Sequence, residues 1–429
     1  MKTKLFTIAV LVLTLSVKAQ WVSQSSGFTT AGLGINDISI VNANVAWATA
    51  FDTSGTNVVN LYTRTLNGGT TWTPGSITGA TALDLTSISA YNKDTAWVSM
   101  LNNNTGGGAI YRTNNGGAMW TKQTTAAFAS PSGSTDFIYM FDKNSGVCVG
   151  DSNTGSWEIY TTINGGTLWT RVTTGNIPAN LIGEIGYENS YSVIGNTIWF
   201  GTSTGRVYKS VNKGATWTVS TTGLTSVTRV AFKDANNGLA TDGFLLKSTS
   251  NGGTTWSTLT FTGSLYQTDL TFIPGTTGTY ISTGSTSSGA TTKGSSYSTN
   301  DGATWINIDA VSHSAVAFLN STTGWSGGIN TSSTVAGIYK WNGSFTTGIK
   351  NNDYLKVAET LIFPNPFSNK ITIIKSNVTE TQVQIYNSLG SLTYSTKIES
   401  EKTELNLAGL PSGIYFVIIG SEISKIIKE

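Results

Sequence analysis

The chain has 429 residues, of which 11% are charged, with a formal net charge of +2 and one cysteine, Cys148. This length allows one large domain or two to three smaller ones. A nearly neutral chain has no polybasic face, which argues against a nucleic-acid partner, and a single cysteine excludes an intramolecular disulfide. Gly, Ser, Thr and Asn supply most polar positions, a composition that favours an all-β exported protein.

The first 19 residues predict a secretory signal peptide. Two lysines precede an apolar run from Leu5 to Val17, and small residues end the segment at Ala19. A run of about 13 residues is too short to cross a bilayer of about 30 Å. No later stretch is as long without polar residues, so we expect no transmembrane segment and an exported chain that begins at Gln20 after cleavage.

A signature of the form [ST]-x-N-x-G-x-x-W occurs six times between residues 65 and 305, with successive Trp residues 48, 49, 48, 39 and 49 positions apart. Repeats of this length are typical of propellers and solenoids. Each signature lies between two short strands, so it predicts a hairpin turn in which Asn bonds the backbone and Trp packs on a neighbouring repeat. The residues assigned to this structural role are Asn67, Trp72, Asn115, Trp120, Asn164, Trp169, Asn212, Trp217, Asn251, Trp256, Asn300 and Trp305.

Two further strands precede each signature, which gives the four strands of a propeller blade. A seventh repeat lacks its last strand, because no Thr-Trp tail follows "GIYKWNG" at residues 337–343. The segment "WVSQSSG" at residues 21–27 is such a tail without a turn before it. We therefore predict that residues 21–27 pair with the strand around 338–341. This pairing closes a seven-bladed β-propeller over residues 20–346 and removes its open edge.

The six signatures resemble the Asp-box (BNR) repeat of sialidase-like propellers, consensus S-x-D-x-G-x-T-W, and the repeats of photosystem-assembly and related secreted propellers are more similar still. The resemblance covers about residues 21 to 346. All six copies carry Asn where the Asp-box family carries Asp. This difference argues against the turns as metal or acid sites.

The composition changes after Phe345, where we place a linker over residues 347–358. Residues 359–429 predict a small antiparallel β-sandwich. The pieces "FPNPFSN", "VQIYNSLG", "LNLAGLPSGIYFVII" and "SKIIKE" resemble the type A sorting domain of type IX secretion, the Por secretion tail. The resemblance implies passage through the periplasm, recognition by the type IX machinery, and a final location that is secreted or at the cell surface.

No catalytic or metal-binding constellation is evident in the sequence. Spacing assembles neither a Ser–His–Asp set nor a metal cluster around His313, the only histidine, so we predict no metal and no cofactor. The sialidase resemblance implies an F/Y-R-I-P motif, which is absent. Sialidase activity is therefore not expected.

Weak candidates for a site remain on the inner strands. Asp37 and Asp269 hold equivalent positions in the first and sixth repeats, as the paired carboxylates of a glycosidase would, and Arg229 holds that position in the fifth. The alternative is solvated acids at strand ends. Trp157 and Tyr266 are candidates for stacking on sugars, or equally for core packing. Long polar loops between second and third strands favour recognition over rigid catalysis.

These observations favour an exported, non-catalytic propeller that binds a protein or a polysaccharide. The alternative is a glycoside hydrolase or lyase that uses Asp37 and Asp269. A purely structural role in a surface layer is a third hypothesis, and it predicts neither binding nor turnover.

Overall fold

The computed structural model describes residues 20–151, 155–286, 292–332, 335–345, 360–375, 381–420 and 422–429. The chain divides into two compact units between Thr347 and Gly348. The expected signal peptide (1–19) and linker (347–358) lie outside the described residues, as do parts of three long loops. The regular secondary structure of the described residues is almost entirely β-strand, with one short 3₁₀ turn, η1 (Thr174–Asn176).

The first unit contains five four-stranded antiparallel sheets whose strands follow one another in chain order. This order is the simple up-and-down arrangement that short hairpin connections favour. The sheets are β6 (Asp84–Ala90), β7 (Ala96–Leu101), β8 (Gly108–Thr113), β9 (Thr121–Lys122); β10 (Thr135–Met140), β11 (Gly146–Gly150), β12 (Tyr160–Thr162), β13 (Thr170–Arg171); β14 (Gly186–Ile194), β15 (Thr197–Thr202), β16 (Arg206–Ser210), β17 (Thr218–Thr221); β18 (Arg229–Phe232), β19 (Gly238–Thr241), β20 (Leu246–Thr249), β21 (Ser257–Leu259); and β22 (Asp269–Phe272), β23 (Tyr280–Gly284), β24 (Gly294–Ser298), β25 (Ile306–Asp309).

An eight-stranded sheet joins the two ends of this unit. Its halves touch through one residue pair, Gly34 with Ile329. One half holds β2 (Leu33–Ile40), β3 (Ala46–Asp52), β4 (Leu61–Thr65) and β5 (Thr73–Ser76); the other holds β26 (Val316–Asn320), β27 (Thr323–Asn330), β28 (Ala336–Trp341) and β1 (Trp21–Ser25).

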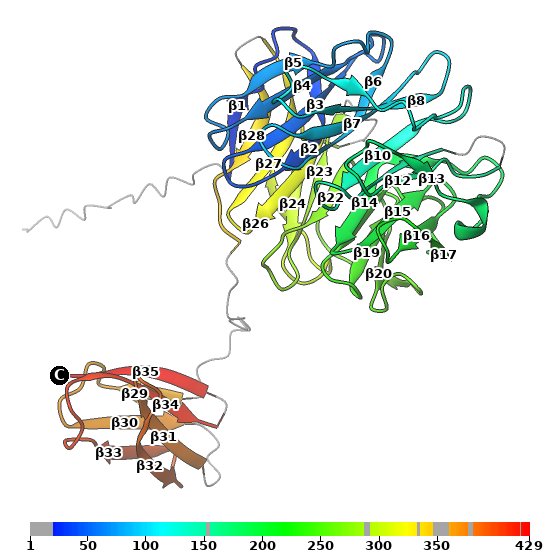
Figure 1. Cartoon of the computed structure of the whole chain (residues 1–429). Helices are drawn as coiled ribbons and strands as arrows, with labels where there is room; N and C mark the ends of the chain where they lie inside the picture. Colours follow the sequence, from blue (N-terminus) through cyan, green and yellow to red (C-terminus); the bar gives the residue numbers. More distant parts are fainter. Residues whose placement is uncertain are drawn as a thin grey trace, which may run out of the picture. The chain divides into compact units, whose positions relative to one another are not determined.

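The predicted pairing of the two ends is confirmed. β1 is antiparallel to β28, in a register that runs from Trp21 opposite Trp341 to Ser25 opposite Gly337, and Figure 1 shows the blue N-terminal strand beside the yellow ones. The Trp21 ring packs edge-on against Trp341, with centroids 5.0 Å apart. β1, from the beginning of the unit, therefore provides the last strand of a group whose other three strands, β26, β27 and β28, come from the end of the unit.

The six signature turns share one hydrogen-bond pattern. In the third, Thr162 Oγ1 accepts from Gly166 N at 2.9 Å and Asn164 Oδ1 accepts from Leu168 N at 2.9 Å. Gly166 has φ of 90°, a conformation that glycine adopts without steric cost. The same pair of bonds recurs in the other five turns. The Asn residues thus cap the turns, as the sequence predicted.

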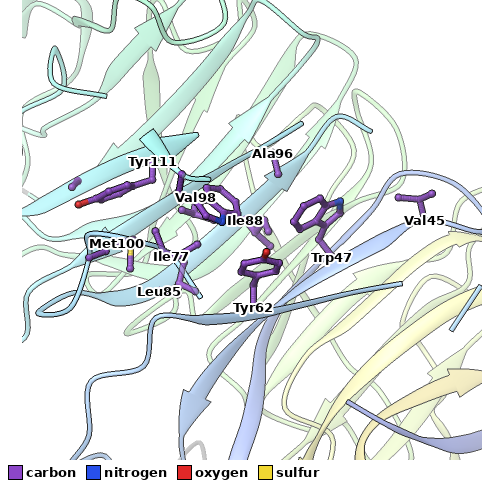
Figure 2. Packing of buried hydrophobic residues seen from close by; sticks show 13 residues of the cluster. Val45, Trp47, Tyr62, Ile77, Leu85, Ile88, Ala96, Val98, Met100 and Tyr111 are labelled. Carbon is purple, nitrogen blue, oxygen red and sulfur yellow. The ribbon is translucent and has the colours of Figure 1, made fainter. Parts of the chain in front are cut away.

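Apolar side chains fill the space between neighbouring sheets. Figure 2 shows one such cluster, in which Trp47 and Tyr62 from the first four strands meet Ile88, Val98 and Met100 of the next sheet. Five of the six signature Trp side chains are buried, and Trp256 is half-buried. Sheet-to-sheet contact around a ring therefore provides the core of this unit.

The second unit consists of two antiparallel sheets with a common core that includes Ile373, Ile385 and Val417. Alternation of buried and exposed residues along the strands, as in the run from Gly413 to Ile419, follows from the period of two of a β-strand. The strands are β29 (Thr360–Phe363), β30 (Lys370–Lys375) and β33 (Lys402–Asn406) in one sheet, and β32 (Leu392–Ile398), β31 (Thr381–Asn387), β34 (Gly413–Ile419) and β35 (Glu422–Lys428) in the other.

Candidate functional site

Two cavities meet near the first strands of the sheets in the first unit. The inner cavity, of about 280 Å³, is lined by the first strands of several sheets, including Asp37 and Asp269. The outer cavity, of about 290 Å³, is lined by the loop after β3 and by Asp84 and Glu188. Asn36 and Arg229 line both cavities, so they mark the junction.

The structure brings three predicted site residues together at the inner cavity. Asp37 Oδ2 accepts from Ile88 N at 2.9 Å, and Asp269 Oδ2 accepts from Val316 N at 2.8 Å. Each carboxylate thus bonds the first strand of the following sheet, which reflects their equivalent positions in the repeat. The other Asp269 oxygen accepts from Arg229 Nε at 3.1 Å. Part of the bonding capacity of both acids is therefore used to hold adjacent sheets together.

A bulge interrupts β14, the first strand of its sheet. Its pairing with β15 jumps from Gly186 opposite Thr202 to Tyr191 opposite Phe200, so that five steps along β14 match two along β15. Residues 187–190 are the unpaired part of this segment. Bulges of this kind redirect side chains and are common beside binding and active sites.

The bulge brings Glu188 and Asn189 into contact with β2 and β6, the strands that hold Asn36 and Thr86. Asn189 Nδ2 donates to Thr86 O on β6 at 3.0 Å, and Asn36 Nδ2 on β2 donates to the same carbonyl at 2.9 Å and to Glu188 Oε2 at 3.4 Å. Asn189 has φ of 57°, a left-handed conformation that Asn tolerates better than most residues. These bonds fix the bulge at the junction of the two cavities.

Loss of solvation raises the pKa of the carboxyl groups around this junction. Glu188 is exposed to solvent at the cavity, but the protein that surrounds it reduces the solvation of its carboxylate and raises its pKa to about 7. Asp84 and Asp151 add like-charge repulsion, against the opposing effects of Asn36 and Arg229. Burial likewise raises the pKa of Asp37 to about 6 and that of Asp151 to about 7. These groups therefore change protonation near neutral pH, unlike carboxyl groups in water.

Asp136 lies behind the bulge and is 4% exposed. Burial, and then repulsion from Asp151 and Glu188, hold its pKa well above the usual range. Within the part of the chain that the structure describes, its Oδ2 atom has no hydrogen-bond partner. Asp84, Asp136, Asp151 and Glu188 were not predicted as site residues from the sequence.

The two predicted aromatic residues lie elsewhere. Trp157 is 2% exposed and packs edge-on against the stacked rings of Phe200 and Tyr208, each centroid 5.3 Å away. Tyr266 is 8% exposed and lines a separate groove beside Phe244. Neither lines the two cavities, and the packing interpretation fits the Trp157 contacts.

His313 belongs to a chain of polar contacts that spacing in the sequence did not predict. Its Nδ1 atom lies 2.6 Å from Ser326 Oγ, and its Nε2 atom lies 3.1 Å from Asp309 Oδ2. Both His313 and Ser326 are fully buried, and the imidazole packs against the Trp21 ring. Because a substrate would have to reach the serine, this arrangement supports the closing strand and is not a catalytic site. The structure groups no three His, Cys, Asp or Glu residues as a metal site anywhere in its described ranges.

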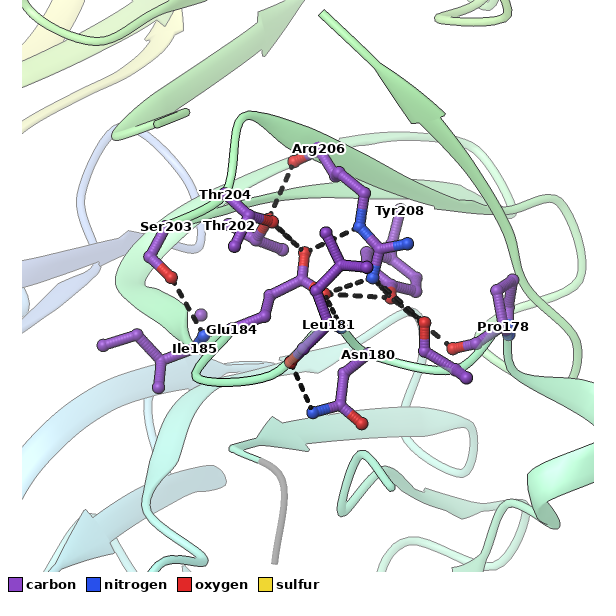
Figure 3. Close-up of polar contacts among 12 residues, drawn as sticks. Pro178, Asn180, Leu181, Glu184, Ile185, Thr202, Ser203, Thr204, Arg206 and Tyr208 are labelled. Atoms are coloured by element: carbon purple, nitrogen blue, oxygen red, sulfur yellow. Dashed lines mark hydrogen bonds and ion pairs between the residues drawn. The ribbon is translucent and has the colours of Figure 1, made fainter. Parts of the chain in front are cut away.

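A buried ion pair fixes the segment that leads into β14. Figure 3 shows the Glu184 carboxylate accepting from Arg206, from Thr202 Oγ1 at 2.6 Å and from Thr204 Oγ1 at 2.6 Å. Burial opposes ionisation of Glu184, but the bonds from Arg206 and the two hydroxyls hold its pKa below the usual value. The backbone on either side of Glu184 is thereby fixed, although Ile182 is fully exposed to solvent.

A family model described as a secretion system C-terminal sorting domain matches residues 361–429. Such a tail directs export through the type IX secretion system and interacts with its machinery, so this protein is secreted or located at the cell surface. Across the described residues, no helix has the length and apolar character needed to span a membrane.

Solved structures with similar folds are propellers. The chain is similar to YCF48 bound to D1 peptide, with a TM-score of 0.54 and 15% identity over 76% of this chain and 97% of that one. For YCF48 from Cyanidioschyzon merolae, the TM-score is 0.54 and the identity 18%, over 75% of this chain and 99% of that one. For the GH74 xyloglucanase from Xanthomonas campestris, the TM-score is 0.50 and the identity 11%, over 82% of this chain and 59% of the enzyme. At these identities the likeness shows the propeller-like fold alone.

A short sequence match links the chain to an ulvan lyase of Nonlabens ulvanivorans. The two are 31% identical over 88 residues, which is 20% of this chain and 16% of the lyase. The chain thus matches less than a fifth of the length of that enzyme. Together, these findings describe an exported protein with a propeller-like first unit and a type IX sorting domain at its C-terminal end.

Proposed function

We propose that residues 20–346 form a seven-bladed propeller of the Asp-box type that acts at the cell surface as a non-catalytic binding module. The eight-stranded sheet, which divides at one residue pair, then counts as two blades beside the five four-stranded sheets. Residues 1–19 are the signal peptide in this proposal, 347–358 the linker and 359–429 the sorting domain. The shared turn pattern supports the Asp-box assignment, with Asn in place of Asp.

The observation that carries the binding proposal is the bulge in β14, which places Glu188 at the outer cavity, bonded to Asn36 at the junction of the two cavities. Arg229 and Asp269 lie beside it as an ion pair, and Asp37 lines the inner cavity. Other strands of this unit also carry register shifts, but each of those inserts one extra residue, whereas β14 takes five steps against two of β15. Such a pronounced local irregularity is typical of a functional site. We therefore assign ligand binding to Asp37, Glu188, Arg229 and Asp269.

Two contacts favour binding over catalysis. Asp37 and Asp269, the carboxylates of the enzymatic alternative, each accept a hydrogen bond from the backbone of the next sheet, which holds them in place at the cavity wall and favours a fixed binding contact over proton transfer. A polysaccharide or a protein segment is the ligand class that the cavities suit. YCF48 was solved with a bound peptide, which shows that a propeller of this kind accommodates such a ligand.

One observation favours the alternative of a glycoside hydrolase or lyase. The raised pKa values of Asp37 and Glu188, beside a solvent-filled cavity, are typical of groups that exchange protons during catalysis. The likeness to a xyloglucanase adds only that the propeller fold hosts such chemistry.

One screen separates these functions. The mature protein is tested for binding and for turnover on a polysaccharide panel that includes xyloglucan and ulvan, and on peptide arrays. Turnover that Asp269→Asn abolishes would overturn the binding-only proposal, whereas binding without turnover would exclude the enzyme. Neither binding nor turnover would favour the structural role. Asp94→Asn, at an exposed turn, is the matched control for the loss of one charge.

A further inference from the structure

We propose that the ligand of the two cavities is a cationic polypeptide segment, whose ammonium or guanidinium group enters beside Glu188. This inference rests on the proposed binding function and names its ligand class. It is based on the charge of the site, on a buried acid without a partner, and on the apolar side chains beside it.

The charges that line the two cavities are unbalanced. Among the described lining residues, Arg229 is the one basic side chain, and its Nε atom is bonded to Asp269. In the described part of the chain, Glu188 accepts one long hydrogen bond, from Asn36 Nδ2 at 3.4 Å. A cluster of one sign in a partly enclosed site attracts ligands of the opposite sign. The five lining carboxylates are Asp37, Asp52, Asp84, Glu188 and Asp269.

Asp136 provides an independent indication. Its carboxyl is 4% exposed, its Oδ2 atom lacks a hydrogen-bond partner within the described residues, and its charged neighbours are Asp151 and Glu188. Both Asp136 and Asp151 lie against Gly186, the residue at which the bulge begins: Asp151 Oδ1 accepts from Gly186 N at 2.7 Å. A buried acid left unpaired is costly. A cation bound at Glu188 would reduce the repulsion that Glu188 exerts on Asp136.

The surroundings of the acidic hollow fit a polypeptide better than a small cation. The segment that enters β14 ends three residues before Glu188 in the chain and exposes the side chains of Leu181, Ile182 and Ile185. The Glu184–Arg206 pair holds this segment in place, so its apolar side chains stay exposed on a fixed backbone (Figure 3). Fixed apolar groups on the segment that leads into a site of one charge match a chain that alternates basic and apolar residues.

The test uses the mature full-length protein and two fluorescent peptides, an oligolysine and a peptide of alternating Lys and Leu. Both are expected to bind, the second more tightly, and an oligoglutamate is not. Glu188→Gln is expected to weaken both peptides by about tenfold, because a bond to a charged group is lost. Asp94→Asn should leave both affinities unchanged. Ile182→Ser should remove only the advantage of the Lys–Leu peptide.

Equal losses in Glu188→Gln and Asp94→Asn would show unspecific attraction and overturn the inference. Binding of Ca²⁺ at the cavities without binding of either peptide would also overturn it. A third outcome is that neither peptide binds, but a polysaccharide does and Arg229→Gln abolishes its binding. This result would refute the cationic ligand while the proposed binding function stands. The absence of every ligand would refute both.

Discussion

The signature turns and the β14 bulge are both irregular pieces of backbone in one ring of sheets, but they differ in how their polar groups are satisfied. Each of the six turns repeats the same two bonds to its Ser or Thr and its Asn. The bulge is the largest register shift among the described strands, holds Asn189 at positive φ and leaves Glu188 with one long hydrogen bond from the described residues. A repeated and satisfied motif serves the scaffold, whereas a single and unsatisfied one indicates function.

The largest effect that separates the two regions is expected at a signature Trp. Trp169→Ala removes a fully buried ring and should lower the free energy of unfolding by about 3–5 kcal/mol without changing ligand affinity under native conditions. Urea unfolding measures the loss. Trp256→Ala is the matched control and should cost less, because its ring is half-buried. Equal costs at both positions would contradict this account of inter-sheet packing.

A smaller effect is expected at the hydroxyl that organises each turn. Thr162→Val keeps the shape of the side chain but leaves Gly166 N–H without its acceptor, so unfolding should become easier by about 1–3 kcal/mol. Thr170→Val, on the exposed strand that follows, should change the stability by no more than about 0.5 kcal/mol. Indistinguishable unfolding curves for the two variants would show that the turn bond is unimportant.

The scaffold could be predicted from the sequence because the same turn and the same strand pattern repeat along the chain. Six copies of one turn specify the hairpins, and the truncated seventh repeat implies that residues 21–27 complete it, as the pairing of Trp21 with Trp341 confirms. Asp37, Arg229 and Asp269 could be predicted to lie together because they occupy one repeated position, and they line one cavity. Periodicity thus identifies whatever each blade has in common with the others.

Glu188 was missed for the same reason. Its strand reads "GYENSYSVI", and the bulge removes the register by which the other first strands align, so no equivalent position could be assigned there. The signal in the sequence was a long strand with an acid inside it. The contacts of Asp136 and His313 depend on strands that are distant in the chain, which spacing alone does not bring together.

The smallest effect concerns pH. Glu188, Asp37 and Asp151 have raised pKa values in the fold, so between about pH 4 and pH 7 the folded state binds more protons than the unfolded state, and stability falls as the pH rises. The melting temperature should therefore be higher at about pH 5 than at about pH 8. Glu188→Gln removes one of these groups and should reduce the difference. Parallel profiles for the wild type and the variant would contradict the raised pKa of Glu188.

The most direct test of the binding site is proton release during the titration of an oligolysine peptide. At about pH 6.5 a fraction of Glu188 is protonated, and a bound cation favours its charged form, so protons should leave the protein as the peptide binds. Calorimetry in two buffers of different ionisation enthalpy measures the number of protons released per peptide bound. The account predicts a net release that Glu188→Gln diminishes. The same heat in both buffers, or the same release from the variant, would contradict it.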